Sequence, residues 1–221
     1  MPVATQLADG LGDGLAALGE QGDLAGRAEE RLRRYLALLT KWNRVYNLTA
    51  ITNPEQMITH HVLDSLAIAA PLDALLAGKE GVRVLDVGSG AGLPGIPLAI
   101  ARPGWRLTLL DCNSKKTAFI AQAVAEIGLT NVNVVTARVE SFAGAPFDAI
   151  VSRAFSSLRE FVTSTRALLG PTGCWAAMKG SVPRDEVREL PSDVECRAVR
   201  RLRIPGLDAE RHLLLLKVKT E

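Results

Sequence analysis

One stretch, residues 82–95 with the sequence VRVLDVGSGAGLPG, constrains the fold more than any other part of this 221-residue chain. It begins with the apolar, β-branched residues of a buried strand and continues into a loop that holds four glycines. Pro94 and Pro97 follow, and proline is tolerated in the first turn of a helix, where a missing N–H costs little. A strand, a glycine loop and a helix in this order bring backbone amides and a helix N-terminus close to a nucleotide-like ligand.

Two ligands fit this loop. The run from Gly90 to Gly95 satisfies the G-x-G-x-x-G pattern of dinucleotide sites. The run from Asp86 to Gly92 instead resembles motif I of class I S-adenosylmethionine (SAM) methyltransferases. Asp86 favours SAM, because a carboxylate repels pyrophosphate and attracts a sulfonium or an ammonium group. Asp111 ends the next apolar run and suits ribose hydroxyls in either ligand. A glycine turn without a ligand is disfavoured, since both acids fall at strand ends.

Composition sets broad limits on the partner. The chain is 48% apolar, which is ample for a core, and its net charge of +2 does not by itself indicate nucleic-acid binding. The basic residues gather in two clusters, and each is compatible with phosphate binding or with a merely solvated face. The first cluster is Arg27, Arg31, Arg33, Arg34, Lys41 and Arg44; the second is Arg197, Arg200, Arg201 and Arg203.

The three cysteines, Cys112, Cys174 and Cys196, lack the spacing of metal ligands or of a disulfide framework. Free thiols in a cytosolic protein are the simplest interpretation. No apolar run approaches the about 20 residues that a membrane span needs, and the N-terminus lacks the pattern of a signal peptide. We therefore expect a cytoplasmic protein with no metal site and no membrane contact.

Apolar runs alternate with helical periodicities after the glycine loop, and two strands, 197–204 and 212–218, close the chain. This order predicts an α/β fold, namely a doubly wound, mostly parallel sheet with an antiparallel C-terminal strand at or near one edge. We expect a flexible N-terminal tail over residues 1–27 and a single domain over 28–221, with N-terminal helices at 28–78 and the SAM-binding core at 79–221.

The residues from Asn53 to Gln56 have the types of a helix start and predict a helix to about residue 70. His61 and Asp64 share one face of this helix, so they are placed to form a structural pair or to contact substrate. Further helix boundaries are marked by Asn113 or Ser114, Gly128, Ser157 and Gly170.

In open α/β sheets the ligand lies beyond the carboxyl ends of the strands. Beyond the glycine loop and Asp111, this rule selects residues 138–141, residues 152–155 and Lys179. Glu140 is suited to accept from an adenine amine. Arg153 follows a buried strand, where an arginine is unusual unless it is paired or faces a ligand. Arg153 and Lys179 together suit an anionic polymer such as nucleic acid.

Five blocks of sequence carry a narrower resemblance. They are residues 43–49 (NRVYNLT), 61–65 (HVLDS), 85–98 (LDVGSGAGLPGIPL), 152–155 (SRAF) and 178–180 (MKG). In this order they resemble the bacterial 16S ribosomal RNA (guanine-N7)-methyltransferase family, also called glucose-inhibited division protein B, from about residue 29 to about residue 219. The resemblance implies a Rossmann-like class I SAM methyltransferase, with SAM as cofactor and 16S rRNA as partner. It further implies a substrate within the small ribosomal subunit or an assembly intermediate, and a monomeric enzyme.

The resemblance also implies site residues. Gly88 and Leu93 match SAM-contacting loop positions, and Val139 with Glu140 matches the adenine-side pair. Ala91 departs from the family, in which many members carry proline. The expected cofactor-binding residues are Asp86, Gly88, Gly90, Gly92, Leu93, Asp111, Val139, Glu140 and Arg153. The expected catalytic residues are Arg153, Lys179, Asn47 and His61.

Guanine N7 has an exposed lone pair, so its attack on the methyl group needs no general base. We expect the protein to act by holding the reacting atoms in line. Phe155 or Trp42 is placed to stack on an exposed guanine, although both also suit a core. Three alternatives stay open: a methyltransferase acting on a protein or a small molecule, a SAM-binding partner protein without activity, and, more distantly, an NAD-dependent oxidoreductase.

Overall fold

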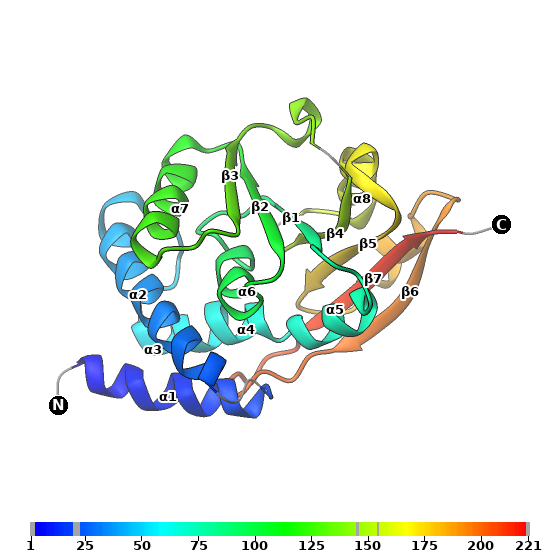
Figure 1. Cartoon of the computed structure of the whole chain (residues 1–221). Helices are drawn as coiled ribbons and strands as arrows, with labels where there is room; N and C mark the ends of the chain where they lie inside the picture. The colour runs from blue at the N-terminus through cyan, green and yellow to red at the C-terminus, as the bar shows by residue number, and fades with distance from the viewer. Residues whose placement is uncertain (1–2, 20–22, 145, 154, 220–221) are drawn as a thin grey trace.

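The alternating strands and helices build one seven-stranded sheet in the order β3-β2-β1-β4-β5-β7-β6 (Figure 1). The computed structural model describes residues 3–19, 23–144, 146–153 and 155–219. Strands β3 to β5 pair in parallel along this order, and β7 runs antiparallel between β5 and β6. The predicted fold class is confirmed. The strands are β1 Arg83–Val87, β2 Arg106–Asp111, β3 Val132–Thr136, β4 Phe147–Ser152, β5 Leu169–Lys179, β6 Val194–Arg201 and β7 His212–Val218.

Helices cover both faces of the sheet, because successive strand residues point to opposite sides. On β1, Val84 belongs to one buried cluster with side chains of α2, α6 and α7. Leu85 belongs to a second cluster with side chains of α8. The helical elements are α1 Val3–Ala17, α2 Asp23–Tyr46, α3 Pro54–Met57, η1 Ile58–Leu63, α4 Asp64–Leu66, α5 Ala69–Leu76, α6 Gly95–Ala101, α7 Ser114–Ile127, η2 Val139–Ser141, α8 Leu158–Thr165, η3 Arg166–Leu168 and α9 Arg184–Arg188.

Several predicted helix ends are confirmed. Asn113 caps α7, because its side chain accepts from the backbone N–H of Lys115 at 3.0 Å. Gly128 ends the same helix with a φ of 72°. The Ser157 hydroxyl accepts from the N–H of Glu160 at 3.1 Å at the start of α8.

The predicted helix from Asn53 to about residue 70 is interrupted. It begins as expected at Asn53 and Pro54, but η1 is a π-helix that carries both His60 and His61. Single π-turns occur often at functional sites. One backbone group of this turn is bonded outside the helix, since the His60 carbonyl accepts from Arg153 at 3.1 Å. Tertiary contacts therefore help to fix a geometry that the sequence pattern does not contain.

The last strand pair differs in both boundaries of its first strand. Strand β6 covers Val194–Arg201 rather than residues 197–204. Leu202 and Ile204 are buried in the following loop. Because these two residues are apolar, the predicted strand continues to residue 204. They are buried in the loop, however, and do not belong to the sheet.

Part of the N-terminal segment, for which a flexible tail is expected, is helical. Helix α1 covers residues 3–17, and α2 already begins at Asp23. Leu11 and Leu15 are buried in the main core, because their spacing of four residues places them on one helix face. Flexibility of residues 1–27 stays a prediction, and residues 1, 2 and 20–22 lie outside the described part of the chain.

The helical part at 28–78 and the α/β core from 79 onward share one buried cluster. The boundary between them therefore marks a change of secondary structure, and hydrophobic packing continues across it. Among the described helices, none is long and apolar enough to cross a membrane.

Candidate active site

The glycine loop follows β1 at the centre of the sheet. Gly88, Gly90 and Gly92 adopt positive φ angles of 71°, 57° and 84°, which side chains rarely allow. Gly95 is required for another reason, since a Cβ there would lie 2.7 Å from both Asp86 Oδ2 and Leu109 Cγ. The loop closes tightly over its own strand, as the sequence motif predicted.

Two acids hold this loop. Asp111 Oδ2 accepts from the N–H of Gly90 at 2.8 Å, and its Oδ1 accepts from the N–H of Asn113 at 2.8 Å. Asp86 Oδ2 accepts from the N–H of Gly95 at 2.9 Å. Asp86 Oδ1 is buried and has no hydrogen-bond partner. Burial raises the pKa of Asp86 to about 7, although the bond from Gly95 opposes this shift.

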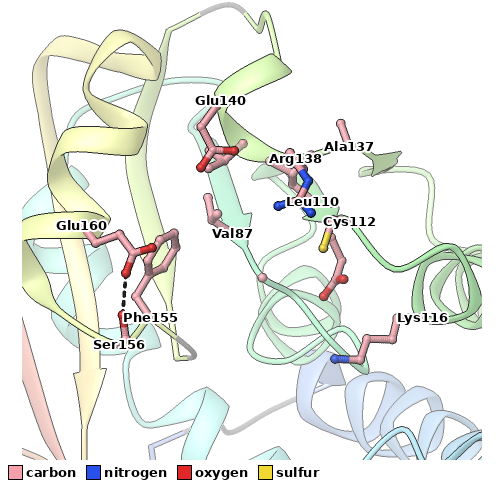
Figure 2. A pocket seen from close by; sticks show the side chains of 13 residues that line it. Val87, Leu110, Cys112, Lys116, Ala137, Arg138, Glu140, Phe155, Ser156 and Glu160 are labelled. Atoms are coloured by element: carbon pink, nitrogen blue, oxygen red, sulfur yellow. Dashed lines mark hydrogen bonds between the residues drawn. The ribbon is translucent and has the colours of Figure 1, made fainter.

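A first pocket of about 420 Å³ opens beside this loop at the carboxyl ends of the strands (Figure 2). Ligand pockets are typically about 300–1,000 Å³. Figure 2 shows the lining side chains, with Ser156 donating a hydrogen bond to Glu160. Four predicted cofactor residues line it, namely Gly88, Asp111, Val139 and Glu140. The full lining is Val87, Gly88, Leu110, Asp111, Cys112, Lys116, Ala137, Arg138, Val139, Glu140, Phe155, Ser156 and Glu160.

The other predicted cofactor residues do not line this pocket. Asp86 and Gly90 take part in the bonds that shape the loop beside it. Gly92 packs against Ile96, and Leu93 is buried. Direct contact of these four residues with a cofactor stays a prediction.

Arg153 lines a second pocket, of about 370 Å³. Phe155, two residues further on, lines the first. The segment after β4 therefore separates two neighbouring pockets; its Ala154 lies outside the described residues. The lining of the second pocket is Ile51, His60, His61, Asp64, Arg153, Met178, Lys179, Gly180 and Arg211.

Asp64 is the charged centre of the second pocket and is only 2% exposed. Its Oδ2 accepts from Arg153 Nη1 at 3.3 Å, and its Oδ1 accepts from Arg211 Nε at 3.1 Å. Burial raises the pKa of Asp64, and the two guanidinium groups oppose this shift without cancelling it. One buried carboxylate thus holds two arginines at the same pocket.

The predicted pairing of His61 with Asp64 is wrong. His61 Nε2 instead lies 2.9 Å from the Thr49 hydroxyl, because the two arginines occupy the carboxylate. Burial and the charge of Arg153 lower the pKa of His61 to about 4, so the ring is neutral at neutral pH. His61 lines the second pocket and fixes the segment that follows α2.

Lys179 lines the second pocket, as predicted, but its charge is paired. Its Nζ lies 2.9 Å from Glu186 Oε2 and donates to the Phe155 carbonyl at 3.3 Å. Glu186 also accepts from the N–H of Leu158 at 2.8 Å. Lys179 and Glu186 therefore anchor the segment between the two pockets.

Asn47, the remaining predicted catalytic residue, is exposed at the end of α2 with a φ of 50°. It is not among the residues that line either pocket, and its role stays a prediction. Trp42 packs between Tyr46 and Phe119, with ring centroids 5.1 and 5.6 Å away. Of the two aromatic residues considered for stacking, Phe155 alone lines a described pocket.

Sequence reasoning missed Arg211. It directly precedes β7, whose first residue His212 pairs with Lys179, the last residue of β5. When two neighbouring strands run antiparallel, the start of one lies beside the end of the other. The start of β7 therefore lies at the edge of the sheet where the parallel strands end. Applying the carboxyl-end rule to the beginning of the antiparallel strand would have identified this residue.

Comparison with known proteins places this arrangement in a family. Residues 28–214 match the GidB family, rRNA small subunit methyltransferase G. The chain is 55% identical over 214 residues to the ribosomal RNA small subunit methyltransferase G of Laribacter hongkongensis, covering 96% of this chain and 99% of that protein. It is 52% identical over 204 residues to the protein of the same name from Neisseria meningitidis serogroup A, covering 92% and 94%.

Solved structures of lower identity share the fold. TrmN from Thermus thermophilus superposes with a TM-score of 0.54 at 19% identity, over 73% of this chain and 53% of that chain. A SAM-dependent methyltransferase from Thiobacillus denitrificans, solved in complex with S-adenosyl-L-homocysteine, gives a TM-score of 0.51 at 14% identity, over 68% and 90%. The sheet is therefore that of a class I SAM methyltransferase.

Proposed function

The chain belongs to the GidB family, rRNA small subunit methyltransferase G, and we propose that it transfers a methyl group from SAM to N7 of a guanine in 16S rRNA. The observation that carries this proposal is the pair of neighbouring pockets on either side of the segment after β4. The first has the residues of a nucleoside site, and the second is lined by cations.

The residues of the first pocket fit SAM. Asp111 accepts one backbone N–H on each oxygen, and each oxygen keeps a lone pair for a ribose hydroxyl. Glu140, which lines the pocket, is suited to accept from the adenine amine. Asp86 does not line the pocket, but its carboxylate holds the adjoining loop, and its buried, unpartnered Oδ1 is suited to a cationic group. When bound, SAM supplies an electrophilic methyl group on a sulfonium.

The second pocket then receives the guanine and its backbone phosphates. Arg153 and Arg211 are donors suited to phosphate oxygens. Lys179 holds the separating segment through Phe155, and neutral His61 holds the loop that contains Thr49. Since N7 carries no proton, these residues serve to position the base for in-line attack. Asn47, beside this loop, is proposed to contact the RNA.

We further propose that the substrate is RNA within the small subunit or an assembly intermediate, and that the enzyme acts as a monomer. The test is transfer of a labelled methyl group from SAM to 16S rRNA, offered as naked RNA and as subunits from a strain that lacks this protein. The product nucleoside is identified by mass, and the mass of the active enzyme in solution is measured by light scattering.

A 7-methylguanosine product whose formation falls at least 100-fold in Arg153→Ala is the expected result. Binding of SAM without label in RNA would overturn the acceptor assignment and direct the search to proteins and small molecules.

Asp86 makes SAM binding pH-dependent. Because its pKa is about 7, much of the ligand-free protein is protonated at this site at pH 6. A bound cation favours the ionised carboxylate, so binding releases a proton, and the affinity for SAM is expected to rise between about pH 6 and pH 8. Calorimetry in two buffers of different ionisation enthalpy measures the proton release.

The same group has the opposite effect on the ligand-free protein. Folding raises the pKa of Asp86 from its ordinary value of 3.8 to about 7. Its contribution to stability is therefore fully present below about pH 4 and is lost as the pH rises through 7. Asp86→Asn is expected to remove both dependences. Proton release that persists in this variant would assign the titration to another group.

A further inference from the structure

The end of the edge strand β6 and the loop that follows it carry exposed arginines that the methyl-transfer site does not use. Arg200, Arg201 and Arg203 are all exposed, and within the described chain none of them forms an ion pair with an acid. Arg197, on the same strand, differs because it pairs with Glu195 at 2.6 Å. We define the arginine stripe as Arg200 and Arg201 at the end of β6, whose side chains point to opposite faces of the sheet edge, and Arg203 in the loop that follows.

The stripe runs toward the second pocket. Arg201 pairs with His212 of β7, and His212 pairs with Lys179 of β5. With strands about 4.8 Å apart, the backbones of Arg201 and Lys179 are about 10 Å apart. The N–H of Leu202 donates to the carbonyl of Arg211 at 2.7 Å. Arg201 and the residue after it therefore lie near Lys179 and Arg211, which line the second pocket.

A charged edge strand has a second explanation, because charges on an edge prevent pairing with other chains. Lysine is the residue most used for that purpose, whereas all the cations of β6 are arginines. Arginine binds phosphate through two parallel N–H donors. Within the described residues, the side chains of these three arginines form no hydrogen bond or ion pair, and exposed Val199 directly precedes Arg200 on the strand. These features fit a ligand surface better than edge protection.

We propose that the arginine stripe binds backbone phosphates of the RNA that flanks the target guanine and so guides this RNA into the second pocket. The proposal rests on the proposed function, since it takes RNA as the substrate. Figure 1 places β6 at the edge of the sheet opposite β3. The acidic residues Asp208 and Glu210 follow the stripe in the loop between β6 and β7.

The test is the triple variant Arg200→Gln, Arg201→Gln and Arg203→Gln. Each lost phosphate contact reduces the slope of log K against log salt by about 0.7–0.9. The variant is therefore expected to bind 16S rRNA with a slope smaller by about 2 and with an affinity at least about tenfold lower at low salt. The kcat at saturating RNA and the affinity for SAM stay unchanged.

The matched control removes the same charge elsewhere, through Arg106→Gln, Lys115→Gln and Arg159→Gln. These three cations are exposed and lie outside both basic clusters, at the start of β2, on α7 and on α8. The control is expected to keep most of the wild-type slope and affinity.

Equal salt slopes of RNA binding in the two triple variants would overturn the proposal that the arginine stripe binds RNA. So would a loss of affinity for subunits with unchanged affinity for naked 16S rRNA, which would assign the surface to a protein partner. Failure of the proposed function would be seen in a different measurement, because wild-type protein would then transfer no methyl group to RNA. The salt slopes of RNA binding test the arginine stripe separately.

Discussion

Gly95→Ala is expected to abolish detectable SAM binding and to lower the free energy of unfolding by roughly 2–3 kcal/mol, the cost of overpacking a tight core site. The added Cβ would lie 2.7 Å from Asp86 Oδ2 and 2.8 Å from Leu109 Cδ1. Asp86 and Leu109 are both fully buried, so neither can move away freely. Displacing the carboxylate also breaks its 2.9 Å bond from Gly95, which leaves a buried acid without partners.

Denaturant unfolding and calorimetric SAM titration measure the two effects. Gly104→Ala is the matched control, because it makes the same chemical change where a Cβ meets nothing within 4 Å. The control is expected to unfold and to bind SAM like the wild type. An unaltered SAM affinity in Gly95→Ala would contradict the view that close packing at this glycine shapes the cofactor loop.

Asp64→Asn is expected to reduce kcat/KM for RNA on the order of 100-fold, which corresponds to about 2.7 kcal/mol of transition-state stabilisation. Arg153 and Arg211 bind different oxygens of the carboxylate, and the amide keeps only one oxygen and places an NH2 donor against the other guanidinium. Both guanidinium groups lose a neutralising charge and their fixed positions at the pocket. Removing one member of a buried ion pair also destabilises a protein by about 3–5 kcal/mol.

Steady-state kinetics with RNA and a separate SAM titration distinguish the effects. The affinity for SAM is expected to stay within about threefold, because Asp64 does not line the first pocket. Asp73→Asn serves as the control, since Asp73 pairs with Arg102 and is 41% exposed, and exposed ion pairs contribute only about 0–1 kcal/mol. A full loss of SAM binding in Asp64→Asn would instead indicate general unfolding and remove the assigned positioning role.

Local sequence predicted the parts of the site that depend on local geometry. The glycine loop follows β1, Asp111 ends β2, and Glu140 lies in the segment after β3, so the carboxyl-end rule places them without knowledge of tertiary contacts. The same locality explains the caps at Asn113 and Ser157, because a capping side chain bonds to an amide two or three residues away.

Sequence could not place the groups that meet across long separations. Asp64 lies 89 residues from Arg153 and 147 residues from Arg211 along the chain. These residues meet only in the folded protein. For this reason the structural pair of His61 with Asp64, one of the two alternatives for these residues, does not form, and His61 contacts the Thr49 hydroxyl instead. The π-turn at η1 has the same origin, since the His60 carbonyl is bonded by Arg153 from another element.

The order of the strands also has a consequence for how the chain matures as it is synthesised. Strand β7 lies between β5 and β6, so β6 emerges from the ribosome before β7, its partner among the described strands. The central strands β1, β2 and β4, which frame the glycine loop, are already complete at residue 152. Domains fold largely from the N-terminus during synthesis, so a nascent chain assembles its cofactor loop early. It acquires its arginine-bearing edge only when the last translated strand closes the sheet.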